Sequence, residues 1–169
     1  MISSLKFSLN PVLAGEWESF AAVPVEELRT EGLSYSTEWY LRSTFSIDWN
    51  GSRLLDPMNG LWEIGLVAVP LNLTPVMNHC VRGEVQPWDI GIGGPRLWFW
   101  PSGDRVEISL VERGEVRPTT TEITTTIDEL IDAVTDICRD CVELVERNLP
   151  TRHAALVLEW WRNGSVPGT

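Results

Sequence analysis

The part of the sequence that most restricts the fold is an amphipathic helix near its C-terminal end. Apolar side chains recur there at alternating spacings of four and three residues, and they are Ile127, Ile131, Val134, Cys138, Cys141 and Val145. This spacing places them on one face of a helix of about six turns. Thr126 and Glu129 have the spacing of a capping box, which satisfies free backbone amides at a helix start. The segment is therefore predicted to be a long helix with one buried face.

A second helix is predicted directly after the first. Pro150 ends the long helix, and Thr151 can act as the N-cap of the next one. Gly164 then stops the second helix, in which four apolar residues share a face: Ala154, Val157, Leu158 and Trp161. The chain is thus predicted to end in two helices packed on a sheet.

Much of the earlier sequence follows the two-residue period of half-buried strands. From Trp39 to Trp49 the sequence alternates: the even positions are Tyr40, Arg42, Thr44, Ser46 and Asp48, and apolar residues at odd positions are Trp39, Leu41, Phe45, Ile47 and Trp49. Phe45 and Ile47 are therefore expected to point into the core, with the opposite face in water. Asn50-Gly51 supplies two positive-φ residues for a tight turn, so residues 53–55 are expected to return antiparallel. A shorter alternation over residues 5–9 predicts another strand.

A second hairpin is predicted around a loop at residues 101–104, between residues 96–100 and an alternating apolar run over 106–110. Residues 97–100 are apolar at every position, so their strand should lie centrally or against a second layer. A Thr-rich stretch over 119–125 favours one more strand. Residues 61–76 are read as a short helix or strand followed by a kinked segment, because Pro70 and Pro75 oppose a long helix.

Together these patterns predict an α+β fold, with a largely antiparallel β-sheet that contains hairpins and is packed by two C-terminal helices. A length of 169 residues suits one domain. We expect a single domain over residues 1–169, with a β-rich body over 1–125 and a helical end over 126–163.

The charge balance narrows the choice of partners. The chain has 13 Lys and Arg against 24 Asp and Glu, which gives a formal net charge of −11. This charge repels phosphate backbones and anionic lipid heads, so neither nucleic acid nor a membrane is expected as a partner. It would speed association with a basic protein, although solubility alone also explains it. The sequence has neither an apolar run of ~18 residues nor a secretory signal pattern, so a cytoplasmic protein is expected.

The residues that could carry chemistry do not form a catalytic motif. Cys138 and Cys141 have the spacing of a redox pair, but they lie far inside the long helix on its apolar face. Buried, reduced thiols are therefore expected. His79 and Cys80 would point to opposite sides of a strand and do not complete a zinc site. No catalytic residue, metal or cofactor is predicted, although 24 acidic residues leave room for a carboxylate-based site.

One candidate binding surface consists of Asp132, Asp136 and Asp140, which we call the acidic row. They repeat every four residues on the long helix. Like charges at that spacing destabilise a helix by ~0.2–0.5 kcal/mol per pair, and a basic partner would relieve this repulsion. A solvated helix face is the alternative interpretation.

A second candidate surface is drawn from the tryptophans, of which the chain has nine. Trp98 and Trp100 share one side of their strand, whereas Trp160 and Trp161 cannot both face inward from one helix. Tryptophan is enriched at binding hot spots, so these four are candidates for partner contacts, with packing beneath a loop as the alternative.

These features together resemble the immunity proteins that bacteria keep beside polymorphic or contact-dependent toxins. The resemblance covers the size, the negative charge, the Trp-bearing hairpin over 96–110 and the helical end over 127–162. It implies a non-catalytic protein-binding module, an inhibitor that neutralises a basic toxin or enzyme. Two other classes remain open: a phage-type inhibitor or DNA mimic, and a small enzyme that uses carboxylate or metal chemistry. The sequence does not indicate an oligomeric state.

Overall fold

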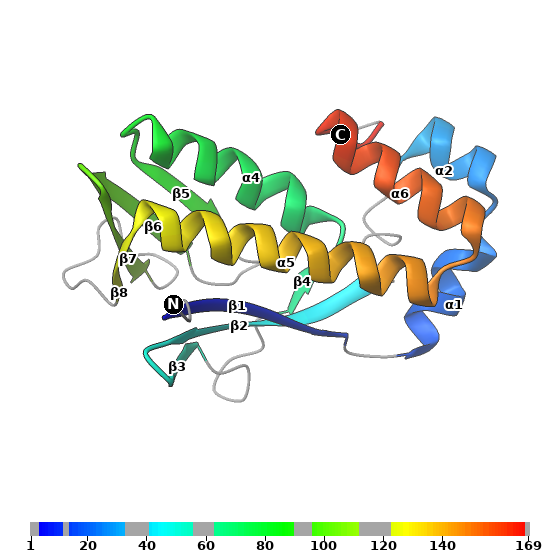
Figure 1. Ribbon diagram of the computed structural model, residues 1–169. Helices are drawn as coiled ribbons and strands as arrows, with labels where there is room; N and C mark the ends of the chain where they lie inside the picture. The colour runs from blue at the N-terminus through cyan, green and yellow to red at the C-terminus, as the bar shows by residue number, and fades with distance from the viewer. Residues whose placement is uncertain are drawn as a thin grey trace.

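Two antiparallel sheets and five helices make up the part of the chain that the computed structural model describes, which is residues 4–11, 14–32, 41–55, 63–89, 96–111 and 123–167 (Figure 1). This is the α+β class predicted from the sequence, with two sheets in place of one.

The first sheet is built around β2 (Arg42–Trp49). On one edge β2 pairs with β1 (Leu5–Pro11), and on the other with β3 (Ser52–Leu55) and β4 (Glu63–Gly65). Asn50 and Gly51 have φ of 51° and 77°, so the predicted tight turn between β2 and β3 is confirmed. Phe45 and Ile47 are 0% and 1% exposed, as expected of core residues. The opposite face of β2 is more buried than expected, because Ser46 is 1% exposed.

The second sheet has the order β5 (Gln86–Asp89), β6 (Arg96–Ser102), β7 (Arg105–Val111) and β8 (Ile123–Thr126). The central place predicted for the apolar strand at 97–100 is confirmed, because β6 has a neighbour on each side. Its turn is shorter than predicted, since Ser102 pairs with Arg105 across Gly103-Asp104. β8 confirms the last part of the Thr-rich strand, while residues 119–122 lie outside the described residues.

The body before residue 126 is less β-rich than predicted. It contains α1 (Ala14–Ala22), α2 (Val25–Glu31) and α4 (Ala68–Val81) in addition to its strands. The expectation that prolines prevent a long helix over residues 61–76 is wrong. Pro70 lies in the first turn of α4, where a backbone amide has no helical partner, and Pro75 is tolerated inside the helix.

The helical end consists of α5 (Ile127–Asn148) and α6 (Thr151–Asn163). The capping box is confirmed, because Thr126 Oγ1 accepts a hydrogen bond from the Glu129 amide at 3.1 Å. Gly164 ends α6 in the left-handed conformation, as predicted. The N-cap of α6 is Pro150, however, so Thr151 is its first helical residue and does not cap it.

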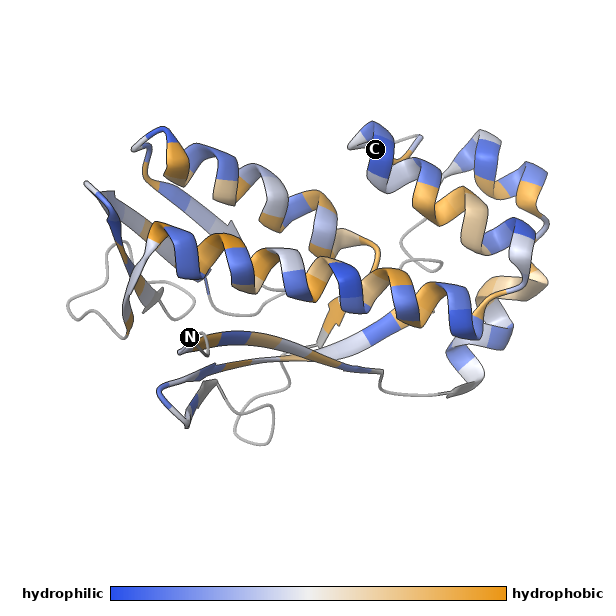
Figure 2. Ribbon diagram, in the orientation of Figure 1, coloured by the Kyte–Doolittle hydropathy of each residue, from blue (hydrophilic) through white to orange (hydrophobic). Residues whose placement is uncertain are grey.

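The long helix α5 packs between the other elements, against α4 and β1, and its first turns meet β7 and β8. Figure 2 shows apolar and hydrophilic residues alternating along it, as its amphipathic sequence requires. Its buried residues are Leu130, Ala133, Val134, Ile137, Cys141 and Val145. The buried face is thus rotated from the predicted stripe. Phe45 of β2 and Trp88 of β5 meet edge to face at 5.1 Å, which joins the two sheets in one core.

Candidate functional site

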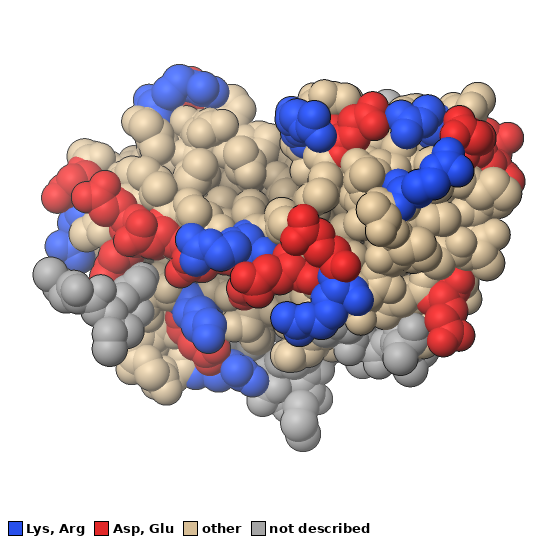
Figure 3. All heavy atoms as spheres, turned by 45° about the vertical axis from the view of Figure 1, so that its right-hand side comes forward, with Lys and Arg blue, Asp and Glu red and all other residues tan. Residues whose placement is uncertain are grey.

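The acidic row lies on the solvent side of α5, where Asp132, Asp136 and Asp140 are all exposed. Neighbouring members stand about 6 Å apart along the helix axis, four residues at ~1.5 Å each. The row is not purely acidic, because Arg139 Nη1 donates to Asp136 Oδ1 at 3.1 Å. Figure 3 shows acidic and basic side chains interleaved across the middle of one face. The helix therefore tolerates its like charges partly through this ion pair.

The aromatic surface on β6 is a stacked pair. The rings of Trp98 and Trp100 are 5.5 Å apart at an interplanar angle of 25°, and both are partly exposed. They alternate with the buried Leu97 and Phe99, so they lie on the face of the second sheet that points away from the core. The indole Nε1 of Trp98 is buried and has no hydrogen-bond partner among the described residues.

The guanidinium group of Arg96 lies next to Trp98 in this aromatic pair. Arg96 Cζ lies 6.0 Å from the centroid of the Trp98 ring, within the range of a cation–π contact. Arg96 also donates to both carboxylate oxygens of Asp89, at 2.5 and 3.2 Å, and this hydrogen bonding raises the pKa of Arg96. The sequence pointed to Trp98 and Trp100 but missed Arg96 and Asp89, because their pairing depends on the β5–β6 register.

The two tryptophans of α6 differ in how far they are buried. As predicted, they do not both face inward: Trp160 is 2% exposed, while Trp161 is partly exposed. The Trp161 indole Nε1 donates to the Val67 carbonyl at 2.9 Å, which ties α6 to the residue before α4. As a partner-binding residue Trp160 was misplaced, because its ring is enclosed in the core.

The cysteines are packing residues. All three are free thiols, and burial raises the pKa of Cys80 to about 11 and that of Cys141 still further. Cys138 is less buried than predicted, since the buried face of α5 is rotated away from it. Its pKa is also raised by burial, and its Sγ lies 3.9 Å from Thr74 Oγ1. Among the described residues no group of three or more His, Cys, Asp or Glu side chains is placed to hold a metal ion.

The acidic row and the Trp98–Trp100 pair lie on different elements, α5 and β6. The Ile127 amide donates to the Asp104 carbonyl at 2.8 Å, so the start of α5 is fixed to the β6–β7 turn. Within the described part of the chain, however, no hydrogen bond or ion pair joins the row to the aromatic pair.

None of the described helices is both long and apolar enough to span a bilayer. Comparison of the chain with protein families, with curated proteins and with solved structures finds no match.

Proposed function

We propose that this chain is a non-catalytic protein-binding module, an immunity-type inhibitor that neutralises a basic toxin or enzyme. The observation that carries the proposal is the acidic row, which stands exposed on one side of α5 while the other side is buried in the core. Rows of carboxylates on a rigid helix attract a basic surface and raise the rate of encounter with it. The net charge of −11 acts in the same direction.

The stacked Trp98–Trp100 pair is proposed as an apolar anchor of the same module. Two partly exposed indoles on a sheet offer a large, rigid contact area, which is the property that makes tryptophan frequent at hot spots. A partner that covered them would gain apolar burial, whereas the acidic row would mainly speed and orient the encounter.

The spacing of the row favours a protein inhibitor over a DNA mimic. Its carboxylates are about 6 Å apart along a single helix, whereas duplex DNA carries one negative charge per ~1.7 Å of its axis. The acidic row therefore has a much lower linear charge density than the phosphate backbone of a duplex. The cysteines lend no support to a small redox enzyme, because burial keeps them as protonated thiols.

The proposal is tested with the proteins encoded beside this chain. Each neighbour is expressed in a bacterial host with and without the chain, and growth is followed. An immunity-type inhibitor predicts that one neighbour stops growth, that co-expression of the chain restores it, and that the two purified proteins bind in calorimetry. A toxic neighbour that the chain neither rescues nor binds would refute the proposal.

A further inference from the structure

Two Asn-Gly dipeptides lie in the described part of the chain, and the structure places them in different settings. Asn50-Gly51 forms the turn between β2 and β3, whereas Asn163-Gly164 stands at the C-terminal end of α6. Both asparagines are exposed. Asparagine followed by glycine is the dipeptide most prone to deamidation, so the chain holds one reactive pair in a turn and one at a helix end.

Deamidation of such a pair needs no reactant other than water. The backbone nitrogen of the glycine attacks the side-chain carbonyl carbon of the asparagine, and a succinimide ring forms as ammonia leaves with the proton of the glycine amide. Water then opens the ring at either carbonyl, which gives aspartate or isoaspartate. No oxidant or reductant takes part. Glycine favours the attack because it has no Cβ, but an amide hydrogen that is donated to a carbonyl must first be released.

At the β2–β3 turn the reacting groups make no hydrogen bond within the described residues. This holds for both the Gly51 amide and the Asn50 carboxamide. A Cβ placed on Gly51 would meet nothing within 4 Å, so the space beside it is open. The ion pair of Asp48 with Arg53 brackets the turn, and the Asn50 backbone amide donates to the Ser4 carbonyl at 2.8 Å. The turn is therefore held at its flanks, while the attacking nitrogen is left free.

At the end of α6 the corresponding glycine amide is occupied. The Gly164 amide donates toward the carbonyls of Trp160 and Trp161, the second at 3.3 Å. Such bonds satisfy the last carbonyls of a helix. Asn163 is itself the last residue of α6. The first step of deamidation at Asn163 therefore requires a broken hydrogen bond and local unwinding of the helix.

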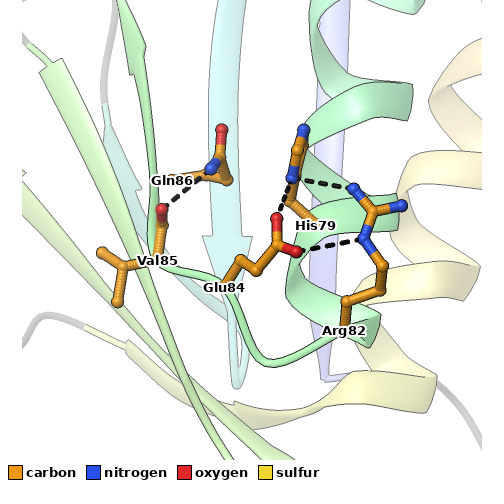
Figure 4. A network of polar contacts seen from close by, with 5 residues as sticks. All are labelled: His79, Arg82, Glu84, Val85 and Gln86. Carbon is orange, nitrogen blue, oxygen red and sulfur yellow. Dashed lines mark hydrogen bonds and ion pairs between the residues drawn. The ribbon is translucent and has the colours of Figure 1, made fainter.

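The turn after α4 shows a glycine that is held from several sides (Figure 4). Gly83 has a positive φ, like Gly51, but its amide donates to a carbonyl of α4 at 2.9 Å. Beside it the side chains of His79, Arg82 and Glu84 form a polar network, in which His79 Nδ1 contacts Glu84 Oε2 and Arg82 Nε donates to Glu84 Oε1 at 3.2 Å. A positive φ alone thus does not leave a glycine amide free, and the Gly51 amide differs in its hydrogen bonding.

We propose that Asn50 is a site of spontaneous deamidation in the folded chain, and that its isoaspartate product opens the β2–β3 turn. Isoaspartate routes the backbone through the side chain and so adds one carbon to a two-residue turn, which the pairing of Trp49 with Ser52 does not accommodate. Aspartate keeps the turn, since Asp-Gly shares the turn preference of Asn-Gly. Either product adds one negative charge to the chain's −11. The site does not depend on the proposed partner surface on α5.

Peptide mapping measures the reaction at each dipeptide. The folded chain is incubated in mildly alkaline buffer, digested briefly with trypsin and analysed by mass spectrometry. Trypsin cuts after arginine and releases the Asn-Gly pairs in separate fragments, which are residues 43–53, 54–82 and 163–169. The second fragment holds Asn59-Gly60, a further pair that lies outside the described residues and does not enter the comparison.

We expect Asn50 to deamidate about two- to tenfold faster than Asn163 in the folded chain. This factor corresponds to the net strength of the one hydrogen bond that the Gly164 amide must lose. In urea that unfolds the chain, the two rates should become equal. Asn163→Gln is the matched control and should leave the rate at Asn50 unchanged. Asn50→Gln should make its own fragment nearly inert, because glutamine must close a larger ring.

Hydrogen exchange tests the effect on the turn. The incubated chain, which contains isoaspartate, is compared with Asn50→Asp, which carries the same added charge on an unaltered backbone. The Ser52 amide should exchange faster in the isoaspartate fraction than in Asn50→Asp, because its pairing with Trp49 is lost.

Several results would overturn the proposal. One is that the folded chain does not react at Asn50 under conditions in which the unfolded chain does. A second is that Asn163 of the folded chain reacts as fast as Asn50 or faster. A third is that exchange at Ser52 is unchanged in a chain that contains isoaspartate at residue 50, which would mean that the product does not open the turn.

Discussion

Replacing Thr126 by Ala removes the N-cap of α5 and tests the element on which the fold depends most. Thr126 Oγ1 accepts from the Glu129 amide at 3.1 Å, and the Glu129 carboxylate accepts in return from the Thr126 amide at 3.5 Å. The same carboxylate accepts from Ser4 Oγ at 2.9 Å and from the Thr125 hydroxyl. The box therefore fixes the start of α5 and joins it to the residue before β1.

Loss of a Ser or Thr cap costs about 1 kcal/mol, with a range of ~0.5–2. For a chain of 169 residues, a loss of ~1 kcal/mol lowers Tm by about 2–4 °C. Urea unfolding followed by circular dichroism measures this difference. Thr126→Ser keeps the hydroxyl and serves as the control, with a loss of less than about 0.5 kcal/mol. Equal stability of Thr126→Ala and the unmodified chain would show that the cap contributes nothing.

The same box predicts a pH dependence. Hydrogen bonding, first from the Thr125 hydroxyl, lowers the folded-state pKa of Glu129 below its ordinary 4.5. A carboxylate with a lowered folded pKa contributes stability that is present above its unfolded pKa and is lost as the pH falls through the folded one. Glu129→Gln should therefore be less stable than the unmodified chain at pH 7, and the gap should close as the pH falls below 4.5. A gap that stays constant at low pH would contradict this account.

Three further predictions concern the core, the thiols and the acidic row. Trp160→Ala should lower the free energy of unfolding by about 3–5 kcal/mol, because a buried ring is lost. Trp161→Phe loses one hydrogen bond and should lower it by about 1 kcal/mol. Equal losses in urea unfolding would contradict the difference in burial between the two residues. Iodoacetamide should label Cys138 of the folded chain before Cys141, because Cys141 is the more deeply buried thiol, and mass spectrometry that finds the reverse order would refute this. Changing the acidic row to Asn should alter the free energy of unfolding by less than about 1 kcal/mol, since three like-charge pairs four residues apart, including the pair of Asp128 with Asp132, and one ion pair are lost together. A larger change in urea unfolding would mean that the row has a structural role.

The features that the sequence predicts well are set by neighbouring residues. Asn50-Gly51 requires only that two adjacent residues adopt positive φ, and the capping box requires only residues three apart. The alternation around Phe45 likewise reports a local property, the side of the strand on which each residue lies.

Features that depend on tertiary packing were missed or misplaced. Helix α4 forms in spite of Pro75, because burial of Val69, Leu73, Val76 and Cys80 offsets a lost backbone hydrogen bond. Helices α1 and α2 were missed because they are short. Pro24 before Val25, and the acidic residues that follow, are nevertheless recognisable signals of a helix start. The acceptor for Trp161 comes from residue 67, and the network around His79 depends on a turn that no spacing rule identifies.

The most direct test of the proposed function is the rate at which the chain associates with the basic protein that it neutralises, measured by stopped flow at several salt concentrations. The acidic row changed to Asn is compared with Glu18→Gln, Glu27→Gln and Glu31→Gln, which alter the net charge by the same amount at exposed positions of α1 and α2. We predict that the row variant associates about tenfold more slowly, with a flatter salt dependence, and that the control changes much less. Equal slowing in both variants would mean that only net charge matters, and it would contradict a recognition surface on α5.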